Sequence, residues 1–159
     1  MDMMNQVKTT ILLTLMTLVV LFTAQTLGYN LIFSLFFAGI FNFLIYFYSG
    51  KIALSSTRAK KIEEDEYDDV RGIVKFLIQK EQMPMPSLYI IENDQPNAFA
   101  TGRNPKNASI AVTTGILKVL NKDELEGVLA HEISHIKNRD ILVSSMAAML
   151  ASTISFMSR

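Results

Sequence analysis

The sequence predicts an α+β fold in which an N-terminal transmembrane helical hairpin precedes a domain of mixed strands and helices. Three features of the 159-residue chain support this expectation. Two long uncharged runs occupy residues 1–50, and strand-like segments follow between residues 87 and 114. A helical run over about residues 123–140 then carries two histidines four positions apart.

Residues 11–29 and 31–49 are each nineteen residues long and contain no charged side chain. An α-helix needs roughly 20 apolar residues to cross a bilayer. Gly28 and Asn30 predict a tight turn between the two runs. A buried hairpin of a soluble protein is the alternative, but neither run shows the polar face that such helices carry. A signal peptide would have a shorter apolar run and a small-residue cleavage site, so we expect a membrane hairpin in 1–50.

The basic residues next to the hairpin predict its orientation. Lys8 precedes the first run, and four basic residues follow the second: Lys51, Arg58, Lys60 and Lys61. The turn between the runs contains no basic residue. Cytoplasmic segments next to membrane spans are enriched in lysine and arginine. We therefore expect a multi-pass protein of the cell's inner (plasma) membrane with residues 51–140 as a cytoplasmic domain.

The amino-acid composition excludes some kinds of partner and some kinds of site. Fifteen basic and fifteen acidic side chains cancel, so the chain lacks the excess positive charge of a nucleic-acid-binding protein, and no nucleic-acid partner is expected. Cysteine is absent, which excludes disulfides and thiolate zinc sites and fits a cytoplasmic domain.

The middle of the chain predicts a helix followed by a small sheet. An acidic stretch, residues 63–69, leads into apolar residues at helical spacing, and Pro84 and Pro86 end that helix. Residues 87–92 and 109–114 are strand-like. The segment near Phe99 has small side chains, so it could hold an extended peptide as an edge strand. An ordinary internal sheet is the alternative.

The helix over about residues 123–140 carries His131-Glu132-Ile133-Ser134-His135, with the only two histidines of the chain. Residues i and i+4 of a helix share one face, so two imidazoles can occupy two corners of a zinc tetrahedron. Glu132 lies one step round the helix, where a general base for metal-assisted hydrolysis would stand. The alternative is a pair of structural histidines in chance register.

Residues flanking this helix have secondary roles. Asn121 and Asp123 are both suitable N-caps, each with a glutamate three positions later. Asp140 lies five residues beyond His135, which on a continuous helix turns it away from the ligand face. We therefore expect Asp140 to cap the helix or to form an ion pair, rather than to orient a ligand histidine.

Residues 141–159 predict a third transmembrane span or its beginning, because residues 141–158 are uncharged and rich in small and hydroxyl side chains. An amphipathic core helix of a soluble domain is the alternative.

Three features of the chain together carry a resemblance to a known family: the two N-terminal runs, the segment PNAFATGRNPKNASIAVTTGIL (96–117) and the segment ELEGVLAHEISHIKNRDIL (124–142). The chain resembles the HtpX family of membrane-bound zinc metalloproteases, which are related to the CAAX prenyl proteases. The resemblance implies a gluzincin-type metalloprotease domain whose zinc is held by His131 and His135, with Glu132 as the catalytic base. It further implies that Asn97, Ala98, Phe99 and Ala100 bind substrate beside the cleft.

The resemblance also implies a role and partners. The expected substrates are misfolded or damaged membrane proteins and unfolded polypeptides, cleaved at the cytoplasmic face of the lipid bilayer as part of protein quality control and the stress response.

The sequence departs from the family pattern at the C-terminal end. The family takes its third zinc ligand from a glutamate on a helix after two further spans, and no acidic residue here has that position. We expect a C-terminally incomplete domain and a chain that is weak or inactive on its own, because two imidazoles bind zinc less tightly than three ligands. A non-catalytic membrane scaffold or assembly module is the alternative, and an unrelated membrane protein with a chance motif is a third interpretation.

Overall fold

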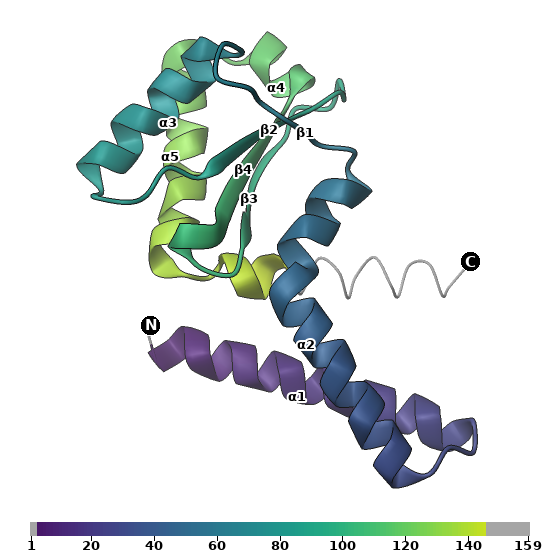
Figure 1. The fold of residues 1–159 in the computed structure, drawn as a ribbon. Helices are drawn as coiled ribbons and strands as arrows, with labels where there is room; N and C mark the ends of the chain where they lie inside the picture. Colours follow the sequence, from purple (N-terminus) through teal and green to yellow (C-terminus); the bar gives the residue numbers. More distant parts are fainter. Residues whose placement is uncertain (1–2, 146–159) are drawn as a thin grey trace.

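The computed structural model describes residues 3–145 and contains a long helical hairpin joined to a small α+β domain (Figure 1). The mixture of helices and strands predicted from the sequence is confirmed. The elements follow one another as α1 (Met3–Thr26), α2 (Leu31–Ser56), β1 (Lys60–Lys61), α3 (Asp68–Lys80), β2 (Ser87–Ile91), β3 (Ala98–Gly102), the 3₁₀ turn η1 (Pro105–Asn107), β4 (Ala108–Thr113), α4 (Thr114–Val119) and α5 (Lys122–Asn138).

The hairpin consists of α1 and α2, which cross and pack against one another toward the connecting turn (Figure 1). Gly28 has a φ of +81°, which a glycine adopts readily, and the Asn30 side chain accepts a hydrogen bond from the Phe33 N–H at 2.8 Å to begin α2. The Asn42 amide donates to the Thr17 hydroxyl at 2.6 Å and ties the two helices together. Both helices are long and apolar enough to cross a membrane, and most of their apolar side chains are exposed.

Helix α2 continues to Ser56, seven residues beyond the uncharged run, and carries the hairpin into the α+β domain. There Leu54 packs against Ile91 and Ala111 of the sheet. The end of the predicted membrane helix is therefore part of the α+β domain's own core.

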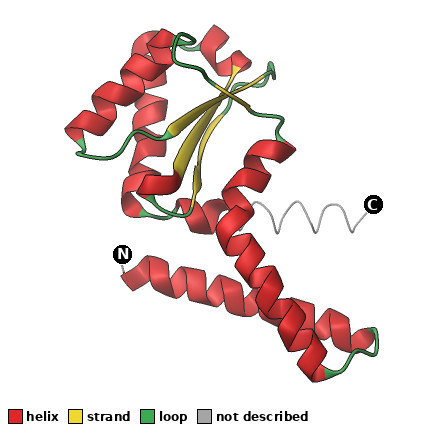
Figure 2. Ribbon diagram, viewed as in Figure 1, coloured by secondary structure: helices red, strands yellow, loops and turns green. Residues whose placement is uncertain are grey.

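The sheet has the strand order β1-β2-β4-β3, with β2 and β4 parallel and the other pairs antiparallel (Figure 2). The two strands predicted at 87–92 and 109–114 are confirmed as β2 and β4. The segment containing Phe99 is strand β3, and it lies at the edge of the sheet as the sequence predicts. Residue Ala98 pairs with Val112, and Ala100 pairs with Ile110.

Helices cover both faces of this sheet. On one face, α3 and α5 bury an apolar core of Val74, Ile110, Val112, Leu129 and Ile133. The other face receives α2, with Tyr89, Phe99 and Ala111 next to Leu54. Alternate residues of each strand point to opposite faces, so neighbouring residues on β3 belong to different layers.

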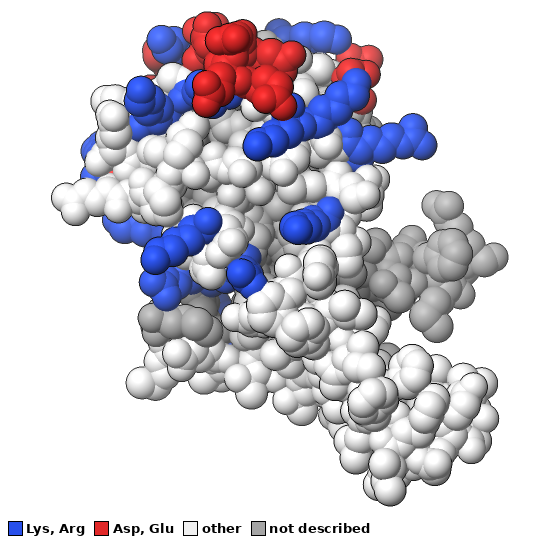
Figure 3. Space-filling view, viewed as in Figure 1, with Lys and Arg blue, Asp and Glu red and all other residues white. Residues whose placement is uncertain are grey.

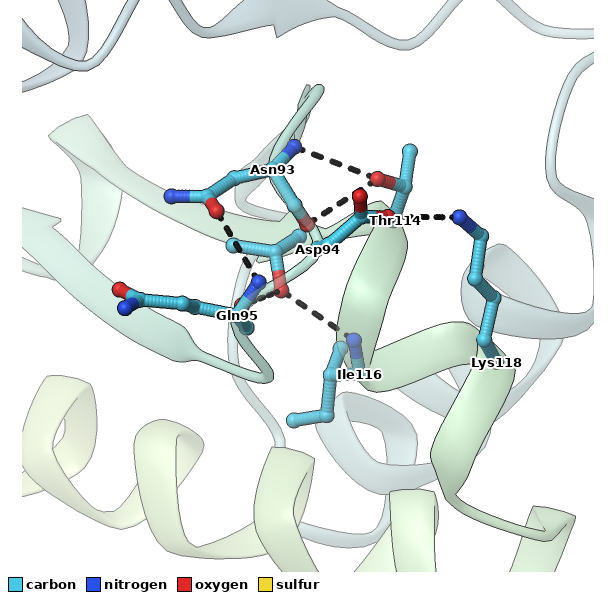
Figure 4. A network of polar contacts seen from close by, with 7 residues as sticks. Asn93, Asp94, Gln95, Thr114, Ile116 and Lys118 are labelled. Carbon is cyan, nitrogen blue, oxygen red and sulfur yellow. Dashed lines mark hydrogen bonds and ion pairs between the residues drawn. The ribbon is translucent and has the colours of Figure 1, made fainter.

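Hydrogen bonds and an ion pair join the turn before β3 to helix α4 (Figure 4). The Asn93 N–H donates to the Thr114 hydroxyl at 3.2 Å, and that hydroxyl donates to the Asn93 carbonyl at 3.1 Å. Lys118 forms an ion pair with Asp94 at 2.7 Å. Gly115 lies so close to Asp94 that a Cβ there would be 2.2 Å from the Asp94 carbonyl oxygen. These contacts determine where the edge strand begins.

Helix α5 begins with a complete capping box. The Asn121 side chain accepts hydrogen bonds from the N–H groups of Asp123 and Glu124, and the Glu124 carboxylate accepts one from the Asn121 N–H. Of the two N-caps that the sequence allowed, Asn121 is therefore the one used. A helix start fixed in this way sets the rotation of every side chain further along α5.

The segment predicted as a third span starts beside the hairpin. Residues 141–145 are helical, Leu142 packs against Met16 and Ile45, and the Ser145 hydroxyl is 2.6 Å from that of Thr101. The rest of this expected span, residues 146–159, lies outside the described residues.

Candidate metal centre

The two histidines of α5 point at a common position. His131 Nε2 and His135 Nε2 are 3.1 Å apart, and the ring planes meet at 86°. Two nitrogens bound to one tetrahedral zinc at about 2.0–2.1 Å lie roughly 3.3 Å from each other. The observed separation is close to that value, so the two imidazoles fit a shared zinc ion.

Asp140 supports the second of these histidines. Its carboxylate oxygens are 3.0 and 3.1 Å from His135 Nδ1. When Nδ1 donates to this carboxylate, Nε2 keeps its lone pair free for a metal, which is the usual arrangement of histidine ligands.

The expectation that Asp140 turns away from the ligand face was wrong, because the helix is not continuous to that residue. Helix α5 ends at Asn138, and Arg139 adopts a left-handed conformation with a φ of +59°. The chain reverses there, and the Asp140 N–H donates to the His135 carbonyl at 3.2 Å. This C-terminal turn brings the carboxylate back beneath the imidazole.

Glu132 points from α5 toward the edge strand. Its Oε2 accepts a hydrogen bond from the Ala100 N–H at 2.9 Å. The contact joins the expected general base to β3 and holds one carboxylate oxygen in place. Sequence reasoning missed it, since only the pairing register reveals which β3 N–H groups point outward.

The four expected substrate-binding residues have different surroundings. The Asn97 N–H donates to the Thr113 hydroxyl, and the Asn97 carbonyl accepts from the Thr113 N–H. Ladder hydrogen bonds alternate along an antiparallel pair, so the backbone groups of Ala98 point to the outer edge of the sheet. The Phe99 ring lies on the opposite face of the sheet from α5, in the cluster with Leu54.

Metal donors are few around this site. Within residues 3–145 no three His, Cys, Asp or Glu side chains form a group that could hold a metal ion. The candidate site therefore has two imidazole donors, His131 and His135. The Glu132 carboxylate lies on the sheet side, and the Asp140 carboxylate contacts His135 Nδ1.

The chain resembles known proteins over most of its length. A family model described as Peptidase family M48 matches residues 64–159, which include α5 and the edge strand. The chain belongs to peptidase family M48.

The M48 assignment is supported by curated relatives along nearly the whole chain. A protein named Protease HtpX homolog from Thermodesulfovibrio yellowstonii is 44% identical over 158 residues, covering 98% of this chain and 56% of the relative. A protein of the same name from Thermococcus sibiricus is 46% identical over 154 residues, covering 96% and 53%. The predicted resemblance to the HtpX family is confirmed, and this M48 chain spans about half the length of the curated relatives it matches.

Proposed function

We propose that this chain carries the catalytic helix of a membrane-bound, gluzincin-type zinc metalloendopeptidase. The observation that carries the proposal is the convergence of His131 Nε2 and His135 Nε2 to 3.1 Å, with Glu132 beside them on the sheet side. Zinc held by these imidazoles would polarise a peptide carbonyl and make a water molecule more acidic.

The protein's own groups divide the remaining work. Glu132 acts as the general base, taking a proton from the attacking water and passing it to the leaving amine. The Ala100 N–H, 2.9 Å from Oε2, fixes the direction of this carboxylate. Asp140 orients His135, so the ligand does not have to reorganise during turnover.

The outer edge of β3 is the proposed place for substrate. An extended peptide can add to a free strand edge through main-chain hydrogen bonds. In this proposal Asn97, Ala98, Phe99 and Ala100 form the peptide-binding strand, with the outward backbone groups of Ala98 as its first contacts. The substrates are misfolded or damaged membrane proteins, and the role is quality control.

In this proposal the hairpin crosses the membrane and holds the site next to it. With the turn at Gly28 on the outer side, the basic residues after α2 and the whole α+β domain lie in the cytoplasm, in accordance with the positive-inside rule. In this arrangement the protein is a multi-pass protein of the inner membrane, and residues 141–159 form or begin the third span.

The third metal ligand is proposed to come from beyond these 159 residues. Residues 3–145 offer two imidazole donors, and residues 146–159 contain no His, Cys, Asp or Glu. On this proposal the isolated chain binds zinc weakly and hydrolyses peptides slowly. The same shortage of donors favours, as the second candidate function, a non-catalytic membrane scaffold related to such proteases.

Two measurements on the detergent-purified chain test the proposal. Elemental analysis after dialysis against a mild chelator should find far less than one zinc per chain. A value near one would mean that a third ligand comes from this chain or from a second copy, and the two-donor site would be wrong.

The second measurement is casein hydrolysis with zinc added. Glu132→Gln should abolish the slow hydrolysis while leaving zinc binding unchanged, because Glu132 is a base and no ligand. Glu126→Gln, on the same helix, is the control and should match the wild type. Equal hydrolysis by the Glu132→Gln protein would refute the assigned base, and absence of hydrolysis in every variant would favour the scaffold.

A further inference from the structure

A cavity of about 470 Å³ lies on the opposite side of the sheet from α5, where α2 enters the α+β domain. Two kinds of side chain dominate its lining. The aromatic group comes from α2 and β2, and the basic group from α2 and the β3–β4 connection: Phe43, Tyr46, Phe47, Tyr48, Tyr89, Lys51, Arg103 and Lys106. No Asp or Glu lines the cavity.

Two of the three cations of this cavity, Lys51 and Arg103, lie over aromatic rings. Lys51 Nζ lies 5.7 Å from the centre of the Tyr48 ring, and the Arg103 guanidinium carbon lies 4.8 Å from that of Phe47. Among residues 3–145, the lysines of the ion pairs are Lys60, Lys118 and Lys137, all outside the cavity. The positive charge around the cavity is therefore not neutralised by a carboxylate of the described chain.

Close backbone packing holds the two sides of the cavity together. A Cβ added to Gly50 would lie 3.1 Å from the Gly102 Cα, so an alanine at this contact between α2 and β3 would require a shift of a few tenths of an ångström. Gly102 itself has a φ of +135°. Beyond it, the Asn104 side chain accepts from the Asn107 N–H at 3.0 Å and closes the turn that presents Arg103 and Lys106.

The cavity lies at the level where helix α2 of the hairpin meets the α+β domain. Its α2 aromatic residues lie in the second half of the uncharged run 31–49, and Lys51 follows that run directly. Arg103 and Lys106 reach the same level from the connection between β3 and β4. Figure 3 shows basic side chains where the uncharged surface of the helices meets the α+β domain, and acidic side chains gathered at the far end of that domain. With the hairpin in a bilayer, aromatic and basic residues at this height lie among the lipid headgroups.

We infer that this cavity binds the phosphate group of an anionic phospholipid from the leaflet next to the α+β domain. Arg103 and Lys106 contact the phosphate oxygens, as guanidinium and ammonium groups do in phosphate sites, and Lys51 adds a third positive charge. The exposed rings of Phe43 and Phe47 provide the apolar surface for the acyl chains. The inference rests on the proposed membrane hairpin and is independent of zinc.

Native mass spectrometry of the full chain in detergent tests this site. The probes are dioctanoyl phosphatidylglycerol, dioctanoyl phosphatidylcholine and inorganic phosphate, each at the same concentration. We expect at least fivefold more retained phosphatidylglycerol than phosphatidylcholine, with one lipid per chain. Equal retention of the two lipids would overturn the inference, and complete displacement by equimolar inorganic phosphate would identify a free-phosphate site instead.

Variants with matched charge changes locate the lipid. Arg103→Gln with Lys106→Gln should lower phosphatidylglycerol retention at least fivefold. Lys75→Gln with Lys122→Gln removes the same charge from exposed positions on α3 and α5 and should leave retention unchanged. The exchange Arg103→Lys with Lys106→Arg keeps the charge and should keep most of the binding, which separates loss of the site from misfolding. Equal loss in both glutamine pairs would overturn the site.

Two further controls distinguish failure of the lipid site from failure of the proposed protease function. Glu132→Gln and His131→Ala should retain phosphatidylglycerol like the wild type, whether or not the chain proves to be a protease. Alkaline carbonate extraction of membranes checks the hairpin: release of the chain would overturn both the insertion and the lipid site. An integral chain without a preference for phosphatidylglycerol would overturn the lipid site alone.

Discussion

Asp140 contacts His135 twice, through its carboxylate at 3.0 Å from Nδ1 and through its backbone N–H at 3.2 Å from the His135 carbonyl. The second contact belongs to the turn that ends α5, and the first depends on it. The structure that terminates the helix therefore also positions an imidazole of the candidate metal centre.

Replacing this carboxylate should weaken metal binding without unfolding the domain. Asp140→Ala removes the acceptor for His135 Nδ1 but keeps the backbone turn, and loss of such a supporting contact typically lowers metal affinity about 10–100-fold. A competition titration of zinc against a chromogenic chelator measures the change. Asp65→Ala, an exposed acidic residue before α3, is the control. Unchanged zinc affinity in Asp140→Ala would show that the contact does not support the ligand.

How far the sequence could predict the site depends on the range of each interaction. The helix with His131 and His135 follows from local signals: apolar spacing, an N-cap and the four-residue repeat of the histidines. The position of Asp140 does not, because Arg139 is an ordinary residue that adopts a left-handed conformation, and no local pattern announces that turn.

The edge strand illustrates the same limit. The segment near Phe99 is an edge strand, as the sequence predicts, and its binding of a peptide stays a prediction. Which faces and backbone groups are available depends on pairing between β3 and β4, which are separated by the η1 turn. Because of that register, the Ala100 N–H points outward and donates to the Glu132 carboxylate, and the Phe99 ring packs in the cluster with Leu54.

Blocking the outer edge of β3 should reduce peptide binding. Ala98→Pro removes an outward N–H while leaving the ladder to β4 intact, and edge strands tolerate proline. Loss of one main-chain hydrogen bond to a peptide costs about 1 kcal/mol, or roughly fivefold in affinity. Fluorescence anisotropy of a labelled extended peptide on the Glu132→Gln protein measures this without turnover. Ala98→Ser keeps the N–H and should bind normally, whereas equal binding by Ala98→Pro would exclude strand addition at this residue.

Two glycines of the α+β domain, Gly115 and Gly127, should respond oppositely to alanine. In Gly115→Ala the new Cβ would lie 2.2 Å from the Asp94 carbonyl oxygen, so the turn that begins β3 must shift, and we expect a loss of at least about 2 kcal/mol of folding free energy. Gly127 lies inside α5, and apart from its chain neighbours and the helix's own backbone no atom lies within 4 Å of its Cβ position. Gly127→Ala should stabilise the domain by about 0.5–1 kcal/mol through helix propensity.

Thermal unfolding in detergent, followed by circular dichroism, compares the two alanine variants at one detergent concentration. A lower midpoint for Gly115→Ala and a higher one for Gly127→Ala are expected. Similar midpoints for the two proteins would mean that the contact between Gly115 and the 93–97 turn does not contribute to stability.

The ion pair between Glu81, directly after α3, and Lys137 on α5 should make stability depend on acid pH. The hydrogen bond from Lys137, reinforced by its charge, lowers the pKa of Glu81 below its ordinary value of 4.5. A carboxyl whose pKa is lower in the folded state stabilises the protein fully above the unfolded-state value, and this stabilisation is lost as the pH falls through the folded-state value. Glu81→Gln should therefore unfold at a slightly lower temperature than the wild type at pH 7, and the difference should shrink as the pH falls below 4.5 and through the lowered folded-state pKa.

The effect should be small and sensitive to salt, since Glu81 and Lys137 are both partly exposed to water. Molar sodium chloride at pH 7 should remove most of the difference between the wild type and Glu81→Gln. The exposed pairs Lys60–Glu92 and Lys118–Asp94 are present in both proteins, so the comparison isolates the contact between α3 and α5. A difference that persisted unchanged from pH 7 to pH 3 would assign the role of Glu81 to packing of its side chain, because ionisation would then contribute nothing.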